Sequence, residues 1–97
     1  MKLNKRLVFI AIHEERERQE KLALDGRFLL PVSSLELDAL TKLRILTEEV
    51  GEVANAIDRI SANANQTNLE HLITELVQVA AVCVGWLESL ETVPSHG

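Results

Sequence analysis

The stretch LEHLITELVQVAAVCVGWLESL, residues 69–90, decides the fold of this chain. It is rich in helix-compatible apolar residues, contains no proline, and predicts one long helix. From Val79 to Leu87 every residue is apolar if Gly85 is counted. A helix without a polar face is buried on all sides. We therefore expect a helix covered by its neighbours and, because the chain is short, by a second subunit.

A second long helix is predicted immediately upstream, in LTKLRILTEEVGEVANAIDRI, residues 40–60. Two N-caps compete for its start: Ser33 with Glu36 forms a capping box, and Asp38 follows a turn later. The polar connector SANANQTN, residues 61–68, leads into the next helix, with Thr67 and Glu70, or Asn68 alone, as the cap. Apolar residues recur at a spacing of three and four and define one buried face: Leu40, Leu43, Leu46, Val50, Val53, Ile57 and Ile60.

The rest of the chain supplies a first helix and irregular segments. Residues 3–24 predict a helix, and Asp25 with Gly26 supplies its stop. Residues 27–34 are expected to form a loop, and residues 92–97, which include Pro94, a frayed tail. No stretch alternates like a strand. The class is therefore all-α: an antiparallel bundle of three main helices with a long hairpin, in one domain over residues 1–97 whose core is about 36–91.

Composition limits the classes of partner. The chain has 97 residues, a net charge of -5 and a pI near 5.1, which argues against binding to nucleic-acid phosphates. The longest apolar run, nine residues, is shorter than the roughly 20 that a membrane span needs. The single cysteine, Cys83, fits a reducing compartment. We expect a cytoplasmic protein that binds neither nucleic acid nor membrane and assembles as a homodimer or homotetramer.

An acidic cluster, EExxE, lies in the middle of the second predicted helix. Glu48, Glu49 and Glu52 share one helical face, where like charges repel. Magnesium or manganese would neutralise such a group, because both favour oxygen ligands. The alternative is a solvated acidic face with Arg44 and Arg59 as counter-charges.

A second polar pair lies in the apolar helix and is expected to meet the first. If the two helices fold back at the connector, Glu52 and Glu75 lie roughly 13 and 10 Å from the turn, and Glu49 and Gln78 one turn further. Glu75 has apolar neighbours and therefore needs a partner. That partner is a metal ion or, in the alternative, one of the two arginines, and Gln78 is then an ordinary hydrogen-bonded amide.

These residues carry a resemblance to a known family. LTEEVGEVANAI followed by NLEHLITELVQVAAVCVGWLESL resembles the MazG-like, all-α nucleoside triphosphate pyrophosphohydrolases, whose signature is EExxE, a spacer, then ExxD. The chain has the first motif at Glu48 to Glu52 and the second at Glu75 to Gln78, with Gln where the signature has Asp. The resemblance covers roughly residues 40–91. ERERQEKLALDGRF, from Glu15, is similar to the first helix of short stand-alone phage and bacterial members.

The resemblance implies a magnesium-dependent enzyme, with manganese as a possible substitute, that cleaves nucleoside triphosphates into the monophosphate and pyrophosphate. Glu49, Glu52 and Glu75 would be metal ligands, and Glu48 would bind metal or orient water. Gln78 would ligate through its amide oxygen without adding charge. Further side chains are expected to contact phosphates, sugar or base: Arg16, Arg18, Lys21, Arg27 and Asn55. The alternative for the basic residues of the first helix is a set of surface ion pairs with Glu14, Glu17 and Glu20.

Two other functions stay open. Phosphoribosyl-ATP pyrophosphohydrolase shares the helical scaffold and the chemistry, and a non-catalytic helical module that binds nucleotide or metal would need only the fold. The histidines, His13, His71 and His96, show no metal-ligand spacing. Cys83 and Trp86 lie in the apolar run and are interpreted as packing residues.

Overall fold

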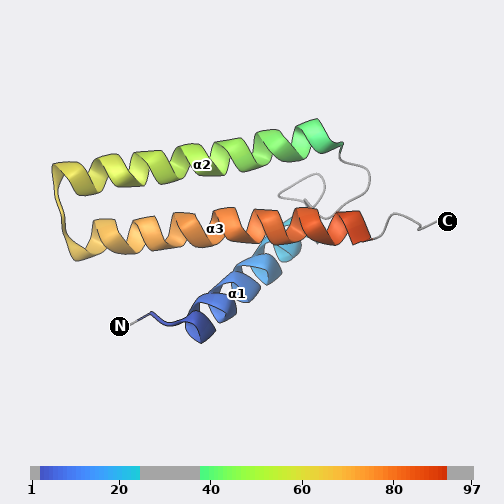
Figure 1. Cartoon of the computed structure of the whole chain (residues 1–97), viewed down its shortest axis with the longest axis horizontal. Helices are drawn as coiled ribbons and strands as arrows, with labels where there is room; N and C mark the ends of the chain where they lie inside the picture. The colour runs from blue at the N-terminus through green and yellow to red at the C-terminus, as the bar shows by residue number, and fades with distance from the viewer. Residues whose placement is uncertain (1–2, 25–37, 92–97) are drawn as a thin grey trace.

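The computed structural model describes residues 3–24 and 38–91, and this part of the chain consists of three α-helices without any strand. They are α1 (Lys5–Leu24), α2 (Ala39–Ala62) and α3 (Gln66–Glu91), shown in Figure 1. The all-α class is therefore confirmed for the described residues. The predicted stop at residues 25–26, the loop, the Ser33 capping box and the tail lie outside them.

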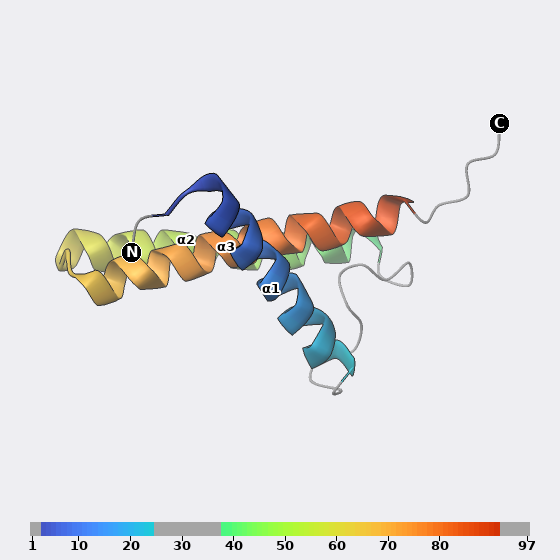
Figure 2. The ribbon, with the colours of Figure 1, turned by 90° about the horizontal axis from the view of Figure 1, so that it is seen from below.

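Helix α3 lies at the centre of the arrangement. Helix α2 runs antiparallel beside it, and α1 crosses it obliquely on another side (Figures 1 and 2). The described backbones of α1 and α2 do not approach each other. The radius of gyration is 15.2 Å, against roughly 12–13 Å for a compact domain of this length. A single copy of the chain is therefore extended, with much of its helix surface uncovered.

Side-chain caps fix where the first two helices begin. Asp38 is the N-cap of α2, and its Oδ1 accepts a hydrogen bond of 2.7 Å from the backbone N–H of Thr41. This bond lowers the pKa of Asp38. In α1 the Oδ1 of Asn4 accepts from the N–H of Leu7 at 2.9 Å, so the helix begins two residues later than predicted.

The start of α3 differs from the prediction by three residues. Asn65 caps the helix, because its Oδ1 accepts a hydrogen bond from the N–H of Asn68 at 2.8 Å. The side-chain amide of Asn68 in turn donates to the backbone oxygen of Asn63 at 2.7 Å and to that of Arg59 at 3.3 Å. These bonds shorten the connector to residues 63–65, because polar residues that suggested a loop cap the two helix ends instead.

The buried apolar core is small, and it follows the predicted face of α2 only in part. Among the described residues only Ala56, Ala81 and Val82 are buried apolar side chains. Val50 and Ile57, predicted to be buried, are about half exposed at 51% and 50%. Leu46, Val53 and Ile60 of the predicted face are partly buried, so α3 packs on one edge of that face and on an adjacent apolar stripe that includes Ala56.

Polar contacts fasten the helices at the end of α3. The buried Lys42 donates from Nζ to Ser89 Oγ at 2.7 Å, which joins α2 to α3. Arg16, also buried, donates to Glu88 at 2.7 Å and to Glu20, which joins α1 to α3. Burial lowers the pKa of Arg16, but the two carboxylates outweigh it and leave the pKa raised.

Helix α3 is long and apolar enough over Gln66–Leu90 to cross a membrane, judged on length and composition alone. A central helix of a soluble protein can pass the same test, and α3 does lie between two other helices. Only 28% of its most apolar stretch is buried within the chain, however. The apolar run is therefore not enclosed on every side by one copy, contrary to the burial expected for a completed bundle.

Candidate metal centre

The acidic residues of the two motifs differ in how far they are buried. Glu75 on α3 is 8% exposed, Glu49 on α2 is partly buried, and Gln78 on α3 is also partly buried. Glu48 and Glu52 are exposed. Glu49 and Glu75 therefore form the inner part of the candidate site, and the other two carboxylates its open part.

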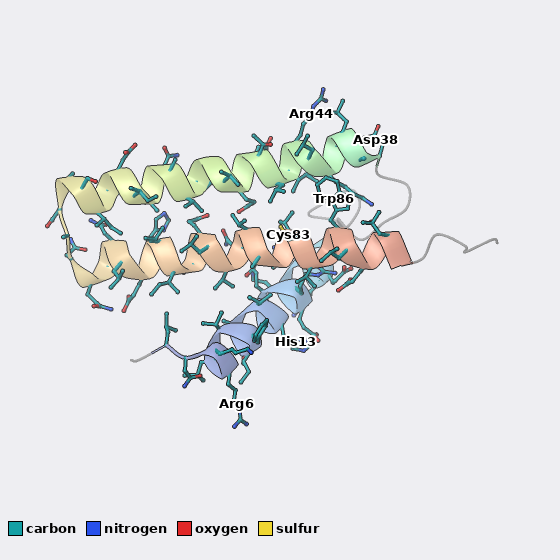
Figure 3. The ribbon with its side chains drawn as sticks, viewed as in Figure 1. Arg6, His13, Asp38, Arg44, Cys83 and Trp86 are labelled. Carbon is teal, nitrogen blue, oxygen red and sulfur yellow. The ribbon has the colours of Figure 1, made fainter. Side chains whose placement is uncertain are left out.

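The inner carboxylates are not satisfied by the protein. The Oε2 atoms of Glu49 and Glu75 are both buried and have no hydrogen-bond partner. Within the described residues, His71 is the sole basic side chain at ion-pair distance from Glu75, with Nε2 at 3.7 Å from Oε1. Arg44, one of the two arginines proposed as alternative partners, points away from α3 (Figure 3). The other, Arg59, is exposed. A buried carboxylate oxygen without a partner costs free energy, which a bound cation would recover.

The electrostatics of Glu49 show which charges lie around it. Burial is the largest cause that raises its pKa, followed by the charges of Glu75, Glu15 and Glu52, while Arg18 acts in the opposite direction. The charge of Glu75 thus acts on Glu49 more strongly than that of Glu52, its neighbour on the same helix. Two of the acting residues, Glu15 and Arg18, come from α1.

Helical periodicity explains why residues of three helices meet here. On α2, Glu48 lies one position before Glu49, and on α3, Thr74 lies one position before Glu75. An offset of one residue rotates a side chain by about 100°. Because α2 and α3 are antiparallel and both right-handed, Glu48 and Thr74, each one position before a carboxylate of the candidate site, point to the same side of the α2–α3 pair. Helix α1 packs on this face, since Arg16 bonds Glu88, one position before Ser89.

A pocket lies between α1 and α3, next to the stretch of α3 that carries Glu75. Three of its residues, Ile73, Thr74 and Val77, belong to the turns of α3 around Glu75. Its α1 side is formed by Glu15 and Arg18 with two neighbours, and the full lining is Ala11, Glu14, Glu15, Arg18, Ile73, Thr74 and Val77. The α3 side of the pocket is thus mainly apolar, and its α1 side carries charged groups.

The residues predicted to bind substrate lie in different surroundings. Arg16 is buried in its contacts with Glu20 and Glu88, so its guanidinium fastens α1 to α3. Lys21 and Asn55 are exposed. Arg27 lies outside the described residues.

The carboxylates are not drawn together into a finished ligand set. Among residues 3–24 and 38–91, no group of three or more His, Cys, Asp or Glu side chains has the arrangement to hold a metal ion. Mutual repulsion gives a physical reason, because like charges stay apart unless a cation lies between them. The two orphaned oxygens fit a hard divalent cation in chemistry, and the side chains would have to close around it.

Sequence patterns did not point to Glu15 or His71. Glu15 lies in the run HEERERQEK, where seven of the nine residues are charged, so no spacing distinguishes this carboxylate from its neighbours. His71 lies one turn before Glu75, which is a signal for contact but not for a role.

Comparisons with protein-family models, with curated proteins and with solved structures gave no match to this chain. The MazG-like resemblance therefore stays a prediction carried by the two motifs alone.

Proposed function

We propose that the chain is a magnesium-dependent nucleoside triphosphate pyrophosphohydrolase with its site at the junction of α2 and α3. The observation that supports this most strongly is the pair of buried, unpartnered oxygens on Glu49 and Glu75. The MazG-like motif assigns metal ligation to the same two residues. Its products would be a nucleoside monophosphate and pyrophosphate, and its role the removal of unwanted nucleotides in the cytoplasm.

The residues divide the work by their burial. Glu49 and Glu75 would hold the cation from inside, and Glu52 from the open side of α2. Exposed Glu48 would orient the attacking water and accept its proton. A bound magnesium or manganese ion would neutralise the polyphosphate and favour attack by water.

Gln78 sets the expected strength of the site. It lies partly buried, one turn beyond Glu75, where the family signature has Asp. An amide oxygen can coordinate a cation, but the site then holds one negative charge fewer. We therefore propose that the site binds one cation tightly rather than two or three cations.

The test is pyrophosphate release by the purified full chain with Mg²⁺ or Mn²⁺, offered all common ribo- and deoxyribonucleoside triphosphates and phosphoribosyl-ATP. Glu49→Ala and Glu52→Ala should abolish the activity, whereas Glu70→Ala, an exposed carboxylate on α3, should not. A preference for phosphoribosyl-ATP would assign the related histidine-pathway activity. No release from any substrate would overturn the proposal.

Calorimetric titration with Mn²⁺ tests the non-catalytic module separately. Binding that is lost in Glu75→Gln supports a metal site, even where turnover is weak. Absence of binding to the wild type would favour a module whose acidic face is only solvated.

Assembly belongs to the same proposal, because one side of the helix pair is left uncovered. On both α2 and α3, a row of apolar residues follows, by one position, the residues that pack between the two helices. The residues one position earlier point toward α1, so these apolar rows point to the opposite side of the α2–α3 pair. We call this the apolar face. Its members are about half exposed: Leu43, Val50, Ile57, Leu69, Leu76, Leu87 and Leu90.

A second copy of the chain is the occupant we propose for the apolar face. Exposed apolar patches of this extent mark association surfaces. The same face on another copy is complementary in character and contains no charge, and joining the two pairs would complete a four-helix bundle. The expected product is a homodimer, or a homotetramer built from two such dimers.

A further inference from the structure

Helix α1 contributes a carboxylate and a guanidinium that face each other. The side chain of Glu15 is only 10% exposed. It accepts hydrogen bonds from Arg18 Nε at 2.8 Å and Nη2 at 2.6 Å, and from Gln19 Nε2 at 3.1 Å. This two-point contact is the strong geometry for an arginine and a carboxylate.

The pair lies near the stretch of α3 that carries Glu75. Glu15 and Arg18 line the pocket whose far wall includes Thr74, the residue before Glu75. Both also act electrostatically on Glu49 across the helix junction. Glu15 and Arg18 of α1 thus act on the same carboxylate of α2 as Glu75 of α3 does.

The excess of negative charge at this junction points to a cation. Glu75 is more than nine-tenths buried, and its Oε2 has no hydrogen-bond partner. The Oε1 atom of Gln19, the other residue that contacts Glu15, is also buried without a partner. Each of the three helices therefore carries a buried side-chain oxygen without a partner, on Gln19, Glu49 and Glu75, and a cation that drew these side chains together would join the helices.

We infer that Glu15 and Arg18 form the third side of the metal and triphosphate site. Glu15 gives a further carboxylate oxygen to the divalent cation, and Arg18 moves from Glu15 to the phosphate groups. The inference rests on the proposed function; it adds Glu15 to the site and makes the phosphate contact expected of Arg18 depend on the metal.

The movement of Arg18 from Glu15 to a phosphate group, which we call the exchange, follows from the charges involved. Without a cation, Arg18 is the counter-charge of Glu15, and its guanidinium is engaged. When a cation takes over the carboxylate, the arginine gains a free donor edge, which suits a phosphate group in the same two-point geometry. Anion binding therefore depends on metal through this one ion pair.

The first experiment measures Mn²⁺ binding by calorimetry and by the electron paramagnetic resonance signal of free Mn²⁺. Glu15→Gln should weaken binding about tenfold or more, as expected when a carboxylate is lost. Glu17→Gln is the matched control, because Glu17 lies on the same helix, is 69% exposed and pairs with His13. It should leave binding unchanged. Equal affinity in Glu15→Gln and wild type would overturn the role of Glu15 while the proposed function stands.

The second experiment titrates the protein with inorganic tripolyphosphate, with and without Mn²⁺. With Mn²⁺, Arg18→Gln should lower affinity roughly 10–100-fold, the loss expected for charge-assisted hydrogen bonds. Without Mn²⁺, Glu15→Gln should bind tripolyphosphate more tightly than wild type, because Arg18 is already free. Arg6→Gln, at the opposite end of α1 and pointing outward in Figure 3, is the control.

The outcomes separate the two proposals. Unchanged tripolyphosphate affinity in Arg18→Gln, with Mn²⁺ binding intact, would contradict the exchange alone. Failure of the wild type to bind Mn²⁺ at all would remove the proposed function together with the inference.

Discussion

The carboxylates of Glu49 on α2 and Glu75 on α3 lie at the same helix junction, and each keeps one buried oxygen without a hydrogen-bond partner. Burial and the charge of Glu75 together raise the pKa of Glu49. An arrangement that is unfavourable for folding is a frequent mark of a binding site. The site is thus expected to lower stability in the absence of its ligand.

Removing the charge of Glu49 should stabilise the metal-free protein. The raised pKa means that the folded state holds the proton more tightly than the unfolded chain, whose ordinary value is 4.5. The native protein therefore loses stability as pH rises from 4.5 through the raised pKa. Glu49→Gln lacks this loss, so its Tm in chelator should exceed that of wild type by an amount that grows over the same pH range.

Thermal unfolding followed by circular dichroism in EDTA measures this difference. Glu48→Gln is the matched control, because Glu48 is adjacent and exposed, and its Tm should stay close to that of wild type. A Glu49→Gln variant that is less stable than wild type at pH 7 would show that the carboxylate is satisfied in the folded state.

Restoring the missing charge should strengthen the site. Gln78→Asp gives α3 the ExxD pattern, and we expect Mn²⁺ affinity to rise roughly tenfold, because cation affinity follows the number of charged ligands. Pyrophosphate release should rise with it. Calorimetry and the activity assay report the two effects, and Gln66→Asp, at the first residue of α3, is a control for added charge alone. An unchanged affinity would place residue 78 outside the site.

The cap of α3 should matter for stability and not for the metal. Asn65→Ala removes the acceptor for the N–H of Asn68 and should cost about 1 kcal/mol. In a domain of this size that lowers Tm by roughly 4–8 °C. Urea unfolding gives the free energy, and Mn²⁺ affinity should stay at the wild-type value, because the site lies turns away. A variant as stable as wild type would mean that the hydrogen bond contributes nothing.

Charge on the apolar face should separate the proposed dimer. Val50→Glu with Leu76→Lys places charges on two side chains that are about half exposed in one copy. Light scattering after gel filtration should give a multiple of 10.8 kDa for wild type and the single mass for the variant. Arg44→Glu, on the outer side of α2, is the control. A wild type that is monomeric at high concentration would contradict the assembly.

Local patterns were enough to predict the three helices, and they also named two residues of the candidate site. Periodicity and the lack of prolines predicted three helices, and Asp38 was identified as one of two possible caps, because capping depends on neighbours in the chain. The acidic motif also singled out Glu49 and Glu75. Their separation by 26 residues was bridged by assuming that the helices fold back at the connector.

The choice between faces needed the tertiary structure. Both apolar stripes of α2 satisfy the helical period, and only packing shows that Ala56 faces α3 while Ile57 stays exposed. Nothing in the local pattern of α1 distinguishes Glu15 from the other charges around it. The role proposed for it rests on where α1 crosses α3, which is set by contacts such as Arg16 with Glu88 across 72 residues. The sequence alone determined which helices form, because helix formation depends on residues close together in the chain. The tertiary structure decided which side chains meet, because the angle between two helices depends on contacts between residues far apart in the chain.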